Sequence, residues 1–236
     1  MAESHPIADR YTVSRTEATP LDEAAYAAVL HSDFHEHYAG GRDIWTGEEA
    51  MRQAPQLLMA ALAHAGRAAD AHVLDLGTGH GRDAELVLAG GHRVTGCDLV
   101  ASPEWDAITA RHPGRARFVA GPVLDLPGSG EYDGVLDNGC FHHQHPDAYA
   151  AYLRHVRELL RPEGLFTVSV FHATGERGGL YANNGNRLYR EFTEDELSAL
   201  VGGHGFALVE AHHVPRAVEG LTYLVATFRR TGGDPR

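Results

Sequence analysis

The sequence predicts a doubly wound α/β fold, in which a seven-stranded sheet with an antiparallel last strand follows an N-terminal helical cap. Apolar strands alternate with helical segments along most of the chain, as in a parallel sheet covered by helices on both faces. The last two strands are joined by residues 213–220 alone, which leaves no room for a crossover helix and requires an antiparallel hairpin. We therefore expect a cap over residues 1–66 and an α/β domain over residues 67–236.

Two helices are expected before the sheet, and together they define the cap. Pro20 suits the first turn of a helix, which we expect to run through His31. The spacing Thr46-x-x-Glu49 is typical of a capping box and predicts a second helix to about residue 65. Pro55 inside that helix predicts a kink or an early break. We expect both helices to lie over the edge of the sheet that binds ligands.

The remaining segments alternate in type, and each has a local reason. Continuous apolar runs are typical of parallel strands that are buried on both faces. Pro103 and Pro146 suit helix starts, and Thr193-x-x-Glu196 is another capping box. The predicted strands are 73–76, 93–96, 117–120, 132–137, 165–171, 207–212 and 221–229, and the predicted helices are 83–89, 102–111, 146–160 and 193–201.

The turn after the first of these strands carries the strongest functional signal. Gly77, Gly79 and Gly81 are spaced by single residues, and glycines let the backbone turn tightly and approach a ligand. The helix that follows offers unpaired N–H groups and a positive dipole end to an anion. The next strand ends on Asp98, which is placed to accept hydrogen bonds from two ribose hydroxyls. The unit therefore predicts a nucleotide-type ligand.

An NAD-dependent oxidoreductase is the alternative enzyme class for such a unit. Its fingerprint is G-x-G-x-x-G, whereas here the third glycine comes one residue early and Arg82 stands in its place. An ordinary strand-to-helix turn is the structural alternative, but a strand, a glycine loop, a helix and a second strand ending in an acid follow in order. A closing antiparallel hairpin also distinguishes this sheet from the NAD-binding one.

The pattern Asp-Leu-Gly-x-Gly-x-Gly-Arg resembles motif I of the class I S-adenosylmethionine-dependent methyltransferases. The resemblance covers about residues 70–229, includes the antiparallel last strand, and implies that residues 67–236 bind S-adenosylmethionine as the cofactor. In this family the loop holds the methionine part, and the acid that ends the second strand binds the ribose. The resemblance implies these cofactor contacts: Asp75, Gly77, Thr78 and Gly79 for the methionine part, Asp98 for the ribose, and Leu99 beside the adenine.

The third-strand stretch departs from the family pattern at the adenine. The family has an acid that contacts the adenine amine, whereas this chain has Pro122 at that place. The contact then falls to the backbone of Val123, to Leu124, or to Asp125 by a different route. We assign Val123 and Leu124 to the cofactor site.

The end of the fourth strand supplies the predicted catalytic residues. Its sequence, Asp-Asn-Gly-Cys-Phe-His from residue 137, resembles small-molecule methyltransferases such as the tellurite-resistance and thiopurine methyltransferase-like groups. We assign Asp137 and Asn138 to the cofactor. His142, His143 and His172 follow central strands, where ligands bind in such sheets, and an imidazole suits removal of a proton from the acceptor. We rank His142 and His172 ahead of His143, and the alternative role for such a histidine is a hydrogen bond to the backbone.

The acceptor is expected to meet two further segments. Residues 173–190 form a long polar and aromatic loop, which predicts a lid over the substrate. The cap contains an aromatic, histidine-rich stretch that suits stacking on a planar acceptor, although the same rings would also fix the cap to the core. Its members are His31, Phe34, His35, His37, Tyr38 and Trp45. His31 and His35 are one helical turn apart, but no third ligand is evident, so we predict no metal.

Composition limits the partners. The net charge is −12 with neutral histidines, which argues against nucleic acid and anionic membranes because phosphate binding depends on clustered basic residues. No apolar run approaches a membrane span and no signal-peptide pattern is present, so we expect a cytoplasmic protein. The sequence predicts a methyltransferase that acts on a small aromatic or heteroatom-bearing molecule. A binding protein that does not methylate remains the third alternative, and the oligomeric state is not predicted.

Overall fold

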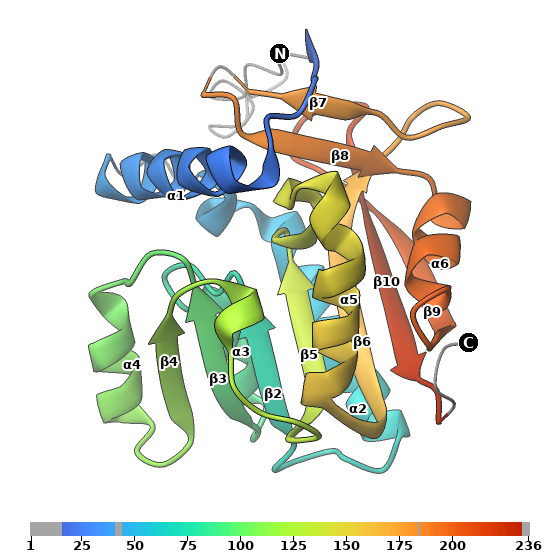
Figure 1. Cartoon of the computed structure of the whole chain (residues 1–236). Helices are drawn as coiled ribbons and strands as arrows, with labels where there is room; N and C mark the ends of the chain where they lie inside the picture. The colour runs from blue at the N-terminus through green and yellow to red at the C-terminus, as the bar shows by residue number, and fades with distance from the viewer. Residues whose placement is uncertain (1–15, 41–43, 184, 233–236) are drawn as a thin grey trace, which may run out of the picture.

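The computed structural model describes residues 16–40, 44–183 and 185–232 of the 236-residue chain. Seven strands form the main sheet in the order β9-β10-β6-β5-β2-β3-β4, and β10 runs antiparallel to both of its neighbours. Figure 1 shows β4, β5 and β6 pointing upward and β10 pointing downward between β6 and β9. The predicted doubly wound seven-stranded fold and its antiparallel closing hairpin are therefore confirmed.

The predicted core segments are found close to their expected places. The main strands are β2 (His72–Leu76), β3 (Arg93–Asp98), β4 (Ala116–Ala120), β5 (Tyr132–Asn138), β6 (Leu160–His172), β9 (Phe206–Pro215) and β10 (Thr222–Arg230). The helices among them are α3 (Arg82–Ala89), α4 (Glu104–Arg111), α5 (Tyr149–Leu159) and α6 (Glu194–Gly202). The capping box of Thr193 and Glu196 forms as predicted.

Two apolar layers hold the sheet. All seven residues of β5 are buried, as expected for a central parallel strand. On one face α5 and α6 pack through a cluster that contains Tyr152, Leu153 and Leu197. On the other face α2 (Gln53–His64), α3 and α4 pack through a cluster that contains Leu58 and Val87. With both faces covered, the carboxyl ends of the strands are left to form the site.

The N-terminal segment differs from its prediction. The first helix, α1 (Glu23–Ala39), begins after Asp22, whose carboxylate accepts a hydrogen bond from Ala25 N at 2.9 Å, and it runs well beyond His31. The start at Pro20 was therefore wrong, because the Asp22 side chain supplies the N-cap.

The second predicted helix, expected from Glu48, is divided into a 3₁₀ turn, Glu49–Arg52, and α2, and another 3₁₀ turn, Ile44–Gly47, precedes it. Pro55 lies in the first turn of α2, so the expected break becomes a helix start. The side chain of Thr46, the predicted cap, lies outside the described residues. Figure 1 shows α1 across the upper end of the sheet, whereas α2 packs on β5 and β6. The domain boundary at residue 66 stays a prediction.

The predicted lid contains a hairpin instead of an irregular loop. Strands β7 (Leu180–Ala182) and β8 (Leu188–Phe192) pair antiparallel, and β1 (Thr16–Glu17) adds to β7. The Asn183 side chain accepts hydrogen bonds from Gly185 N and Arg187 N and so closes the turn. Because β8 also pairs with the last two residues of β6, the hairpin is anchored above the sheet beside α1 (Figure 1).

Candidate active site

A cavity of about 950 Å³ lies at the carboxyl ends of the central parallel strands. Residues at or just beyond the carboxyl ends of β2, β3, β4, β5 and β6 form its floor, and α1 and the β7–β8 hairpin contribute to its roof. This is the place where open α/β sheets bind ligands. Its size suits a cofactor together with a small acceptor, since ligand pockets commonly measure about 300–1,000 Å³.

The glycine loop forms one wall of the cavity. Gly77 lines it with φ +71°, and a Cβ at this position would lie 2.9 Å from Cys140 Cβ, so a side chain does not fit. The loop is held from behind, because Gly77 N and Thr78 N both donate to the Cys97 carbonyl. The Thr78 hydroxyl donates to Asp75 at 2.6 Å. Burial raises the pKa of Asp75 to about 8.

Asp98 lines the cavity beside this loop. Its carboxylate accepts hydrogen bonds from Gly79 N at 2.9 Å, from Val100 N at 3.1 Å and from the Tyr38 hydroxyl at 3.4 Å. Burial raises the pKa of Asp98, and these three donors oppose that shift. A carboxylate held in this way beside a glycine wall fits the ribose end of S-adenosylmethionine.

More of the residues predicted to contact the adenine line the cavity than of those predicted to contact the methionine part of the cofactor. Leu99, Val123 and Leu124 all line it, together with Pro122 at the departure from the family pattern. Asp125 is exposed and is not among the lining residues, so of the three alternatives it has the least support. Predicted residues absent from the lining are Asp75, Thr78, Gly79 and Asp137.

Asp137 and Asn138 have different surroundings. Asp137 accepts hydrogen bonds from Cys140 N at 2.9 Å, Phe141 N at 3.0 Å and the Tyr152 hydroxyl at 2.6 Å. Burial raises its pKa to about 6, and these donors oppose the shift. With its oxygens engaged in this way, Asp137 holds the loop that leads to the histidines.

Asn138 lines the cavity, and its amide donates to Asp83 at 2.6 Å and to the Met51 carbonyl at 2.7 Å. Asp83 also accepts two hydrogen bonds from Arg82. The sequence reasoning missed this link between the start of α3 and the end of β5. Its only signal was an acidic residue in the first turn after the glycine loop.

The three predicted catalytic histidines all line the cavity. His142 and His143 are 2% and 8% exposed, and their Nε2 atoms lie 3.1 Å apart. Burial lowers the pKa of His142 to about 3, with Arg216 and Arg187 contributing, and it lowers the pKa of His143 well below the usual value. His172 is separate and half-buried, and it stacks on His213 at 4.2 Å. Burial and His213 lower the pKa of His172.

Aromatic rings and two arginines complete the acceptor side. Phe34 and Trp45 meet edge to face at 6.0 Å, and the guanidinium of Arg187 lies 4.5 Å from the Phe34 ring centre. His142 stacks on Phe171 at 4.1 Å, and Arg216 lies 4.6 Å from that ring. Sequence reasoning missed Arg216, which lies in the connection between β9 and β10 and gave no local signal.

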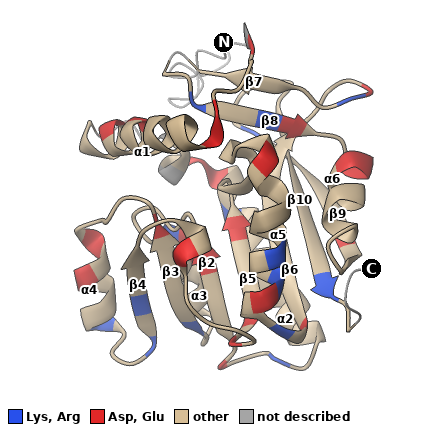
Figure 2. Ribbon diagram, viewed as in Figure 1, with Lys and Arg blue, Asp and Glu red and all other residues tan. Residues whose placement is uncertain are grey.

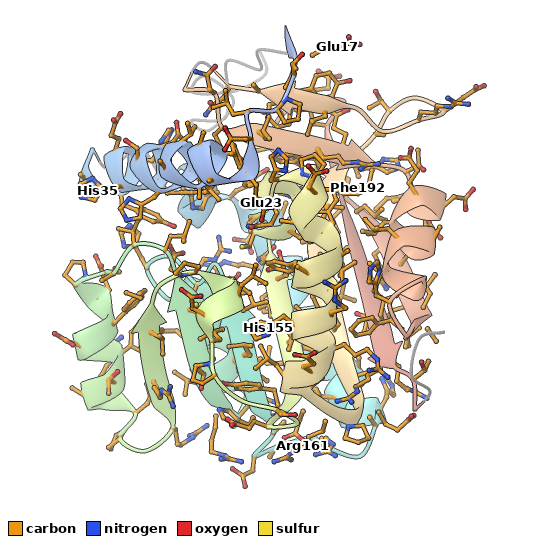
Figure 3. All side chains as sticks on the ribbon, viewed as in Figure 1. Glu17, Glu23, His35, His155, Arg161 and Phe192 are labelled. Carbon is orange, nitrogen blue, oxygen red and sulfur yellow. The ribbon has the colours of Figure 1, made fainter. Side chains whose placement is uncertain are left out.

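The histidine-rich stretch is divided between two environments. Five of its six members line the cavity, as the stacking prediction requires: His31, Phe34, His37, Tyr38 and Trp45. The sixth, His35, is exposed toward the outer end of α1 (Figure 3). His31 and His35 stack on each other at 6.3 Å. Within the described ranges, no group of three or more His, Cys, Asp or Glu residues has an arrangement that would hold a metal ion.

The sheet order, the glycine wall and the acid at the end of β3 define a class I S-adenosylmethionine-dependent methyltransferase. Residues 48–211 match the sequence profile of a methyltransferase domain, and the chain belongs to this family. It is a methyltransferase that uses S-adenosylmethionine and acts on a small molecule. The comparisons do not favour the alternative of an NAD-dependent oxidoreductase.

One solved structure is similar over nearly the whole chain. It is the 1,6-didemethyltoxoflavin-N1-methyltransferase of Burkholderia thailandensis with bound 1,6-didemethyltoxoflavin and S-adenosylhomocysteine. It shares 50% sequence identity and a TM-score of 0.87, and the match covers 92% of this chain and 94% of that chain.

More distant structures share the fold alone. The magnesium protoporphyrin IX methyltransferase of Synechocystis has a TM-score of 0.62 at 18% identity, with 92% of this chain and 100% of that chain covered. A methyltransferase of Methanosarcina mazei has a TM-score of 0.56 at 18% identity, with 72% and 97% covered. A comparison with curated proteins finds no match. Among the described residues, no helix combines the length and apolarity of a membrane span.

Proposed function

We propose that this protein methylates a ring nitrogen of a planar, nitrogen-rich heteroaromatic molecule related to 1,6-didemethyltoxoflavin. The observation that carries the proposal is the aromatic acceptor wall, in which two ring pairs, Phe34 with Trp45 and His142 with Phe171, line one cavity. Planar rings fit such walls by offset and edge-to-face contacts. The 50% identical methyltransferase, named for transfer to N1, supports nitrogen as the acceptor.

The roles of the chain's residues follow from their places. S-adenosylmethionine supplies a methyl group on a sulfonium. Asp98 would bind the ribose, Leu99, Val123 and Leu124 would surround the adenine, and Gly77 would leave room for the methionine part. The contribution of the aromatic wall is alignment, since fixing reacting groups in line lowers a barrier by several kcal/mol, up to about 10. The histidines at the floor are the groups placed to take a proton.

The direct test is methyl transfer from radiolabelled S-adenosylmethionine to a panel of acceptors. The panel contains 1,6-didemethyltoxoflavin, a planar phenol, a planar thiol and an aliphatic amine of similar size. We expect label on a ring nitrogen of the heteroaromatic acceptor and little on the others. Asp98→Ala serves as the control that cofactor binding is required. Preferential methylation of the phenol or the thiol would overturn the nitrogen acceptor.

We further propose that the acceptor is a free small molecule in the cytoplasm, with neither nucleic acid nor a membrane as partner. Support comes from the net charge of −12 and from α1, which carries Glu23, Asp33 and Glu36 and no Lys or Arg (Figure 2). An excess of acidic residues on α1 and on the whole chain disfavours the approach of phosphate polymers. Cys97 and Cys140 are both free thiols, as is usual in a reducing compartment. Cell fractionation and a salt titration of nucleic-acid binding test these points.

A further inference from the structure

His142 and His143 form a hydrogen-bonded pair, and the Leu188 carbonyl at the His143 end determines which nitrogen of each ring carries the proton. The Nδ1 atom of His143 lies 2.7 Å from the carbonyl oxygen of Leu188 in β8. A carbonyl oxygen only accepts, so this nitrogen must carry the proton. In a neutral imidazole the other nitrogen, Nε2, then has a free lone pair.

The tautomer of His143 in turn determines the tautomer of His142. His143 Nε2 faces His142 Nε2 at 3.1 Å, so His142 must carry its proton on Nε2 in order to donate. The lone pair of a neutral His142 is therefore on Nδ1. That atom is buried and has no hydrogen-bond partner among the described residues, although the ring belongs to the cavity lining. A buried acceptor without a partner costs free energy and favours a donor that arrives with a ligand.

The frame around the pair is rigid. The Tyr26 hydroxyl donates to the His143 carbonyl at 2.7 Å and accepts from Leu188 N at 3.1 Å, which locks α1, the pair and β8 together. His142 stacks on Phe171, and His143 meets Phe34 edge to face at 5.6 Å. Neither ring is free to turn, so the direction of the proton chain is built into the fold.

We propose that the two histidines act as one unit, in which His142 Nδ1 accepts the proton of the acceptor nitrogen and His143 is a positioning residue that fixes the tautomer of His142. The inference rests on the proposed function in requiring an acceptor that carries an N–H. As the new carbon–nitrogen bond forms, the N–H proton passes to His142 Nδ1, and the electron pair of the broken sulfur–methyl bond stays on sulfur. The imidazolium then returns its proton to solvent when the product leaves.

The charged groups around the pair bear on the timing of this transfer. Arg216 and Arg187 act on His142, and Arg187 and His37 act on His143, and these groups oppose an imidazolium. Each arginine also lies beside a carboxylate, Glu48 for Arg216 and Asp33 for Arg187. Two backbone carbonyls favour an imidazolium: Leu188 accepts from His143, and Ser169 favours the charged form of the His142 ring, which carries a proton on both nitrogens. The neutral base is therefore present at all physiological pH values but is weak. Transfer of the methyl group makes the acceptor nitrogen cationic and its N–H strongly acidic, which allows a weak base to take the proton as the bond forms.

The first test needs no turnover and no ligand. Long-range ¹⁵N–¹H correlation spectra of the histidine rings report which nitrogen of each ring carries the proton. We expect His143 protonated at Nδ1 and His142 protonated at Nε2, unchanged from pH 6 to 8. His142 protonated at Nδ1 in the neutral state would overturn the proposal. In His143→Leu the tautomer preference of His142 should be lost, and in His143→Gln, whose amide oxygen can accept from Nε2, it should be restored.

The second test uses acceptors that differ in the acidity of their N–H group. His142→Gln should slow methylation by about 10²–10⁴ for the least acidic acceptor, and the loss should shrink toward unity for an acceptor that is already deprotonated at the assay pH. An equal loss for every acceptor would overturn the base role and leave alignment alone.

The matched control is His145→Gln. His145 is buried in the same segment, but both of its ring nitrogens bond to the backbone, at Leu21 O and Asp147 N. Any loss in this variant should be equal across the acceptors. Wild-type enzyme that methylates no nitrogen acceptor would refute the proposed function instead, while the ring spectra would still report on the pair.

Discussion

The carboxylate of Asp98 accepts a hydrogen bond from the backbone N–H of Gly79 at 2.9 Å and thereby joins the end of β3 to the glycine loop after β2. The two residues are 19 positions apart in the chain, yet one contact fixes both sides of the cofactor end of the cavity. Tyr38 adds a third element, because its hydroxyl donates to the same carboxylate oxygen from α1. The roof, the loop and the ribose acid are thus mechanically linked.

Asp98→Ala should weaken cofactor binding by at least about tenfold. The variant loses charge-assisted hydrogen bonds that are each worth roughly 1.5–3 kcal/mol. Calorimetric titration with S-adenosylhomocysteine measures the effect, and circular dichroism checks that the fold persists. Tyr38→Phe is the matched comparison, since it removes one long hydrogen bond and keeps the ring, and its effect should be several-fold smaller. An unchanged dissociation constant in Asp98→Ala would remove Asp98 from the site.

Gly79→Val should abolish cofactor binding. Gly79 has φ +55°, which a β-branched residue adopts only with strain, and a Cβ there would lie 3.3 Å from the Tyr38 hydroxyl. The variant therefore distorts the loop and pushes α1 away from Asp98. Titration with cofactor and an assay of methyl transfer are the measurements. Gly114→Val is the control, because Gly114 also has positive φ but nothing lies within 4 Å of its added Cβ. Normal methylation by Gly79→Val would show that the loop is misplaced.

The places of Gly77 and Asp98 in the cavity wall could be predicted from sequence because their requirements are local. Only glycine fits at Gly77, where a Cβ would collide with Cys140, and Asp98 follows directly from the end of a buried strand. The central strands were equally predictable, because burial on both faces leaves a continuous apolar run, as in β5. Each of these signals lies within a few residues of the feature that it predicts.

The acceptor side could not be read in this way because long-range contacts decide it. Arg216 is 5% exposed at its side chain, and its environment includes Glu48 at 3.6 Å and the ring of Tyr223. No local sequence pattern near Arg216 indicates that its charged side chain is buried. The β7–β8 hairpin is short and polar, and its place depends on Asp33 of α1, which pairs with Arg187 at 3.1 Å.

Asp33→Asn should loosen the hairpin from α1 and raise KM for the acceptor more than it weakens cofactor binding. The Asp33–Arg187 pair is nearly buried, with side chains 10% and 12% exposed, and breaking such a pair costs about 3 kcal/mol because it leaves a buried charge. Urea unfolding and steady-state kinetics provide the measurements. Glu85→Gln is the control, since its pair with Arg111 is half exposed and should be worth less than about 1 kcal/mol. Equal losses of unfolding free energy in the two variants would contradict a stabilising role for the buried Asp33–Arg187 pair.

Asp137→Asn should stabilise the protein relative to wild type as the pH rises from about 4 to 6. Burial raises the pKa of Asp137 to about 6 in the fold, against about 3.9 in the unfolded chain, so the folded state binds the proton more strongly. Wild-type stability from this group is therefore complete below about pH 4 and is lost as the pH rises through 6, by about 3 kcal/mol in total.

Asparagine does not titrate, its oxygen can still accept from Cys140 N and Phe141 N, and the Tyr152 hydroxyl can turn to accept from its amide. Urea unfolding of both proteins from pH 3 to 8 should show the gap opening between pH 4 and 6 and then staying constant, whereas parallel curves would mean that the fold does not shift the pKa of Asp137. Titration with S-adenosylhomocysteine completes the experiment, because a carboxylate that only holds the histidine loop leaves cofactor affinity unchanged and one that binds the cofactor does not.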